Sequence, residues 1–150
     1  MSDYVLDTSA LLTLYYNEPG SQRVTDVLTA ALKPPAGTAS TGVRVFGSFI
    51  TLMEVLYRVW KNEGEAAGRK AYAACQALPI TWVHEAPPLL ELAASLKATY
   101  PMSLGDAWIA ATALQCQAIL LHKDPEFAPV SGLQHEPLPY KRNQVLWADP

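Results

Sequence analysis

Short apolar runs alternate along this chain with segments whose apolar residues recur at helical spacing, and this alternation constrains the fold most. Five runs are expected to be strands: residues 4–6, 43–50, 80–83, 118–121 and, more weakly, 133–138. Gly47 leaves open whether the second run is one strand or a broken one. The expected helices cover residues 8–16, 21–32, 52–60, 65–77 and 89–99, and a last helix starts at residues 103–106. Such alternation predicts an α/β fold with a central, mainly parallel sheet flanked by helices in three layers.

The length favours one domain. A chain of 150 residues, half of them hydrophobic and 17% charged, is long enough to bury a real core. Residues 33–42 form the one linker-like stretch, which is too short to separate two domains. We therefore expect a single domain over residues 1–150, with a core at about 3–138 and a short C-terminal tail.

No signal peptide or membrane-spanning run is evident, so a cytoplasmic protein with no membrane partner is expected. Cys75 and Cys116 lack CxxC spacing and are expected to be buried free thiols. The net charge of −3 argues mildly against a protein that coats itself in nucleic acid. It does not exclude an enzyme whose acidic pocket meets phosphate through metal ions.

Four carboxylates stand where a parallel sheet gathers its functional groups. Asp7 and Asp124 follow strand-like runs, Asp106 lies in the first turn of a helix, and Glu54 lies in an otherwise apolar segment. Unpaired carboxylates in such surroundings would protonate or attract a cation. A set made only of carboxylates suits Mg²⁺ or Mn²⁺ rather than Zn²⁺, and such ions activate water for attack on phosphodiesters.

Each of these residues also has a purely structural interpretation. Asp7 is a good helix cap, and Asp106 would interact favourably with a helix dipole. Glu54 would face solvent from its helix, and Asp124 before Pro125 is typical of a turn. All four structural interpretations would have to hold together to remove the proposed site.

At these positions the sequence resembles the PIN-domain family, and within it the VapC-type toxins of toxin–antitoxin pairs. The resemblance rests on YVLDTSALL at residues 4–12 followed by EPG at 18–20, on TLMEVL at 51–56, and on SLGDAWIAATAL at 103–114. The ordered set is more specific than any single motif and spans residues 4 to about 138. It implies a metal-dependent endoribonuclease that cleaves RNA, a cognate antitoxin that occludes the cleft, and a homodimer.

The resemblance also implies roles for single residues. Asp7 and Asp106 would be the principal metal ligands, Glu54 would complete the cluster or hold a water on the metal, and Asp124 would be the fourth acidic residue. The family usually has Thr or Ser two residues before that aspartate, where this chain has His122. This histidine would either contact metal or phosphate or serve the structure.

Substrate contacts are less specific, and other functions stay open. Arg58 and Lys61 would meet RNA phosphates or form part of a solvated helix face. One alternative is a PIN-like binding module without catalysis. A haloacid-dehalogenase-like phosphatase is a weaker alternative, because that family needs a second aspartate where this chain has Ser9.

Overall fold

The fold is a five-stranded parallel sheet with helices on both faces, which confirms the predicted class. The computed structural model describes residues 2–32, 34, 36–39 and 42–140. The sheet order is β3-β2-β1-β4-β5, and all paired strands run parallel. The strands are β1 (Tyr4–Leu6), β2 (Val45–Ser48), β3 (Thr81–Val83), β4 (Ile119–His122) and β5 (His135–Pro137). Parts of the predicted 33–42 loop and most of the predicted tail, residues 141–150, lie outside the described residues.

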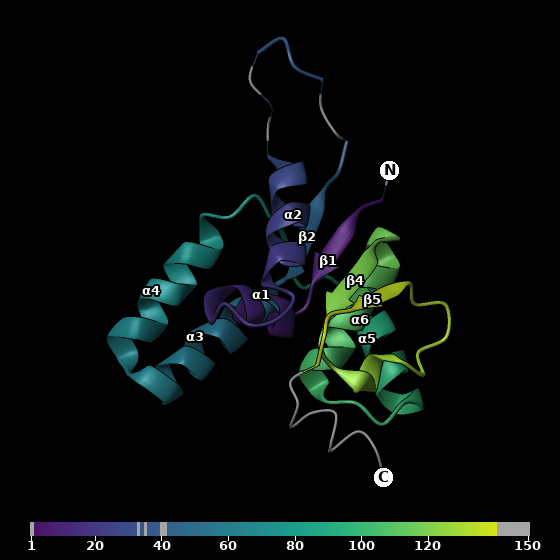
Figure 1. Ribbon diagram of the computed structural model, residues 1–150. Coiled ribbons are helices and arrows are strands. Elements are labelled where there is room, and N and C mark those ends of the chain that lie inside the picture. Colours follow the sequence, from purple (N-terminus) through teal and green to yellow (C-terminus); the bar gives the residue numbers. More distant parts are fainter. Residues whose placement is uncertain (1, 33, 35, 40–41, 141–150) are drawn as a thin grey trace.

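The helices flank the sheet as two groups that follow the two halves of the chain (Figure 1). They are α1 (Thr8–Tyr15), α2 (Ser21–Ala31), α3 (Phe49–Glu63), α4 (Glu65–Gln76), α5 (Pro87–Thr99) and α6 (Leu104–Cys116), with a 3-10 turn, η1, at Pro125–Phe127. In Figure 1 the α3–α4 pair lies on one side of the sheet, and α5 and α6 lie on the other side near β4 and β5.

Alternate residues of the central strands divide the core into two. Val5 of β1 and Leu120 of β4 pack with α5 and α6. Leu6 and Leu121, the next residues along, pack with α1 to α4. All four side chains are fully buried, and each contributes about 1.5–3 kcal/mol relative to an exposed side chain. Successive side chains of a strand point to opposite faces, so a three-residue strand suffices to join both layers.

The second predicted strand is shorter than expected. The apolar run at residues 43–50 gives a strand only at Val45–Ser48, and α3 begins at Phe49 rather than at residue 52. The reason is Ser48, whose hydroxyl caps the helix by accepting the Ile50 N–H at 3.3 Å. Gly47 does not break the strand but pairs with Trp82 of β3.

Two smaller expectations concern the cysteines and the membrane. Both cysteines are free, and Cys75 is buried as expected, whereas Cys116 is only half-buried. Among the described residues, no helix combines the length and apolar character that crossing a bilayer requires.

Candidate metal centre

Asp7 both starts α1 and presents a free oxygen at the carboxyl end of β1. Its Oδ2 accepts the Ser9 backbone N–H at 3.0 Å and a short hydrogen bond from the Ser9 hydroxyl. Among the described residues Oδ1 has no hydrogen-bond partner, although the side chain is only 3% exposed. Burial is the main cause that raises the pKa of Asp7 to about 6; the Ser9 hydrogen bonds oppose it, and the carboxylates of Asp124 and Glu54 add to it.

The Glu54 carboxylate is held by the hydroxyl group of Thr8, which also contacts the hydroxyl group of Thr51. The Thr8 hydroxyl donates to Glu54 Oε1 at 2.6 Å, and the hydroxyl oxygens of Thr8 and Thr51 are 3.1 Å apart. The other carboxylate oxygen, Oε2, lies 3.6 Å from Arg58 Nη2. Oε2 also lies 3.0 Å from where a Cβ on Gly105 would stand, so Glu54 reaches across to the start of α6.

Three further carboxylates cluster around the beginning of α6. Asp106, Asp124 and Glu126 each offer an oxygen within 4.8 Å of the others. Ser103 caps α6 by accepting the Asp106 N–H at 3.2 Å, and its own N–H donates to Glu126 Oε2 at 3.3 Å. Asp124 Oδ1 accepts the Glu126 N–H at 2.9 Å. Burial, followed by hydrogen bonding to the carboxylates of Glu126 and Asp124, raises the pKa of Asp106 well above its usual range.

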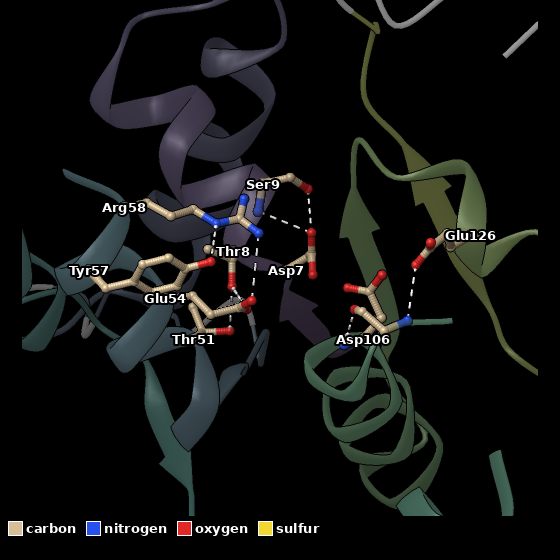
Figure 2. A network of polar contacts seen from close by, with 10 residues as sticks. Asp7, Thr8, Ser9, Thr51, Glu54, Tyr57, Arg58, Asp106 and Glu126 are labelled. Carbon is tan, nitrogen blue, oxygen red and sulfur yellow. Dashed lines mark hydrogen bonds and ion pairs between the residues drawn. The ribbon is translucent and has the colours of Figure 1, made fainter. Parts of the chain in front are cut away.

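The four carboxylates predicted from the sequence line one cavity. Asp7, Glu54, Asp106 and Asp124 all border a space of about 210 Å³ at the carboxyl ends of β1 and β4. In Figure 2, Thr8, Glu54 and Arg58 lie on one side of this space, Asp106 and Glu126 on the other, and Asp7 between them.

This donor set fits a hard divalent cation. Only carboxylate and hydroxyl oxygens surround the cavity on its acidic side, and such ligands suit Mg²⁺ or Mn²⁺. The buried Oδ1 of Asp7, which has no hydrogen-bond partner among the described residues, is free to bind such an ion. Burial and neighbouring carboxyl groups raise the pKa values of Asp7 and Asp106, and a cation bound between them would favour their ionised forms.

Cationic side chains border the acidic cavity on one side. Arg58 and Lys123 line it, whereas Lys61 lies farther out in an adjoining pocket. The ion pair between Arg58 and Glu54 spans 3.6 Å, and the arginine side chain is 44% exposed. An i,i+4 pair of this kind contributes only about 0.3–0.5 kcal/mol, so the guanidinium remains available to a phosphate.

His122 has a structural environment rather than a place in the cavity. It is 1% exposed, its Nδ1 accepts the Asp124 N–H at 3.0 Å, and its Nε2 lies 2.9 Å from His135 Nδ1. Since Nδ1 accepts, the neutral ring carries its proton on Nε2 and donates it to His135. Burial, together with His135, lowers the pKa of His122 to about 4. A direct substrate contact by His122 does not fit these contacts, and we assign it to positioning Asp124.

Two residues of the site were missed by sequence reasoning. Glu126 follows Asp124 by two residues, and their shared turn was the available signal. Lys123 is 2% exposed and extends toward Glu18, with Nζ and Oε1 3.5 Å apart. Nothing in its sequence surroundings distinguishes a buried lysine from a solvated one.

Comparison with known proteins identifies the family. The family model described as "PIN domain" matches residues 4–133. No curated protein matches the chain. Among solved structures, VapBC2 from Rickettsia felis, bound to a DNA fragment of its promoter, is similar with a TM-score of 0.69 and 18% identity over 91% of this chain and 99% of that chain.

Two further solved structures are also similar to this chain. A toxin–antitoxin complex from Klebsiella pneumoniae has a TM-score of 0.58 and 25% identity, covering 87% of this chain and 94% of that one. VapC20 from Mycobacterium tuberculosis, described as a Sarcin-Ricin loop cleaving toxin, has a TM-score of 0.64 and 18% identity, covering 87% and 95%. The match of the family model over most of the chain shows that this protein belongs to the PIN domain family.

Proposed function

We propose that the protein is a metal-dependent endoribonuclease, the toxin of a VapBC-type toxin–antitoxin pair. The carboxylate cavity is the observation that carries this proposal, because its clustered acids, and an Asp7 Oδ1 without a partner in the described part of the chain, favour a divalent cation. Membership of the PIN domain family supports the same reaction class. The neighbour described as a Sarcin-Ricin loop cleaving toxin supports RNA as the substrate.

The residues divide into ligands and positioning groups. Asp7, Asp106 and Asp124 would hold Mg²⁺ or Mn²⁺, with Glu54 and Glu126 completing the set. When bound, the ion supplies Lewis acidity at the phosphate and lowers the pKa of an attacking water. Arg58 would bind the phosphate of the RNA at the edge of the cavity. His122 would fix the backbone of Asp124.

The partners and the location belong to the proposal as well. An antitoxin partner is supported by structural neighbours that are VapBC complexes. The homodimer is proposed from the family resemblance, and the cytoplasmic location is kept as the expectation from the sequence. Sedimentation of the purified chain, alone and with the protein encoded beside it, tests both assemblies.

Cleavage of a mixed RNA pool tests the central claim. The purified protein is incubated with Mg²⁺ or Mn²⁺ and with chelator, and compared with Asp106→Asn and with Glu91→Gln, which alters an exposed carboxylate on α5. We expect metal-dependent cutting that falls by at least about 100-fold in Asp106→Asn, which exceeds the loss typical of residues that only support a metal ligand. Cutting by Glu91→Gln should be unchanged. A folded, antitoxin-free protein that cuts no RNA with either metal would favour the binding module without catalysis.

A further inference from the structure

A second pocket adjoins the carboxylate cavity between α1 and α3. Its volume is about 390 Å³, and its lining includes Tyr16, Tyr57, Arg58, Lys61, Asn62 and Lys123. Ser9, Arg58 and Lys123 border both spaces, so the two are adjacent. A group bound in the second pocket would therefore lie next to a group bound at the acids.

The charge of this pocket is opposite to that of the cavity beside it. Arg58, Lys61 and Lys123 contribute three cations to its lining, against one carboxylate, Glu18, which pairs with Lys123. The whole chain carries a net charge of −3, so this concentration of positive charge is local. Cations beside an acidic, metal-favouring cavity suit a phosphodiester chain that passes from one to the other.

The pocket also offers an aromatic surface. Tyr57 is 43% exposed and is in contact with Arg58, whose guanidinium lies 6.0 Å from the ring centroid and whose Nε donates to the hydroxyl at 3.4 Å (Figure 2). Tyr16 is 39% exposed, and its hydroxyl donates to Glu63 Oε2 at 3.0 Å. Exposed rings that are anchored in this way are suitable stacking platforms for bases. The Asn62 amide adds hydrogen-bonding groups suited to a base edge.

We propose that this pocket binds one unpaired nucleotide of the RNA, adjacent to the phosphodiester that meets the carboxylates. The base stacks on Tyr57, and Arg58, whose side chain is 44% exposed, holds its phosphate. The inference rests on the proposed nuclease function and adds a requirement to it. A pocket of 390 Å³ suits a single nucleotide, whereas a base stacked in a duplex must be extruded to enter.

Binding of RNA with one base removed at a time tests this subsite without any cleavage. Fluorescently labelled short single-stranded RNAs, each with one abasic position, are titrated into Asp106→Asn protein and followed by anisotropy. We expect affinity to fall by about 10-fold at one position, as loss of one stacked base implies, and duplex RNA to bind less tightly than the same strand alone.

Variants at Tyr57 assign the effect to the pocket. In the Asp106→Asn background, Tyr57→Leu keeps apolar bulk but removes the ring, so the position-dependent loss disappears, whereas Tyr57→Phe retains it. Met53→Ala, which alters a residue of α3 that is 57% exposed and lies outside the pocket lining, also retains it. Circular dichroism checks that each variant is folded.

Uniform affinity across all abasic positions, or a position-dependent loss that persists in Tyr57→Leu, would overturn the subsite. Wild-type protein that cuts RNA while showing either result keeps the nuclease function and loses the subsite. Position-dependent binding from a wild-type protein that never cuts supports the subsite and refutes the nuclease. If Tyr57→Leu binds RNA as wild type does but no longer binds a co-expressed antitoxin, the proposal is overturned. The pocket would then be a binding site for a segment of the antitoxin rather than for a nucleotide.

Discussion

Replacing Asp7 with asparagine is expected to stabilise the metal-free protein at pH 8, although Asp7 is a residue of the proposed site. The carboxyl is 3% exposed, and burial raises its pKa from 3.8 to about 6. One pKa unit corresponds to about 1.4 kcal/mol, so ionised Asp7 destabilises the folded state by about 3 kcal/mol relative to the protonated form. Asparagine keeps an oxygen for capping α1 and carries no charge.

The raised pKa of Asp7 determines the direction in which the stability of the fold changes with pH. The stabilising contribution of Asp7 is fully present below pH 3.8 and is lost as the pH rises through about 6. His122 changes stability in the opposite direction, because its pKa is lowered to about 4: its contribution is present above 6.5 and is lost as the pH falls through 4. Asp7→Asn leaves His122 in place, so the contribution of His122 cancels in the difference between the two proteins.

Urea unfolding of both proteins with chelator, at several pH values from 4 to 8, measures this difference. The free-energy advantage of Asp7→Asn is expected to grow by about 2.4 kcal/mol over this range, or about 5–10 °C in Tm for a domain of this size. Asp26→Asn on the exposed face of α2 is the control and should show no such trend. A difference between wild type and Asp7→Asn that does not change with pH would refute the reasoning.

Two more outcomes follow from contacts described above. In thermal denaturation, Mg²⁺ or Mn²⁺ at about 100 times its Kd should stabilise the wild-type protein by about 2.7 kcal/mol. The same ion should leave the stability of Asp106→Asn nearly unchanged. Equal stabilisation of the two proteins would argue against the carboxylate site. Gly47→Ala should destabilise the fold by about 1–3 kcal/mol in urea unfolding, because the added Cβ would lie 2.4 Å from the Trp82 ring. The double variant Gly47→Ala/Trp82→Leu should recover part of this loss. A Gly47→Ala protein as stable as wild type would contradict the close contact between Gly47 and Trp82.

The layers of the fold could be predicted from the sequence, because the apolar pattern that marks each strand lies within a few consecutive residues. Val5 and Leu6 are both apolar, which marks a strand buried on both faces, and the structure assigns them to different cores. The limits of β2 were not accessible in the same way. Phe49 and Ile50 suit a strand as well as a helix, and the cap formed by Ser48 decided between them.

The site was predictable in part, for a geometric reason. Asp7 and Asp124 follow strands that are neighbours in the sheet, so a parallel topology alone brings them to one edge. Glu126 joins through a turn whose hydrogen bonds the sequence does not reveal. Lys123 and His122 depend on burial, which is set by packing of distant segments such as β5.

The arrangement of β1 beside β4 has a consequence for biosynthesis. Asp7 is translated well before Leu121, yet its N–H pairs with the Leu121 carbonyl at 3.0 Å, and the acids at 106, 124 and 126 also come from later parts of the chain. A nascent chain that ends before β4 has no partner strand on that side of β1 and cannot gather these carboxylates. The carboxylate cluster therefore forms only after β4 and the turn that carries Asp124 and Glu126 have been synthesised.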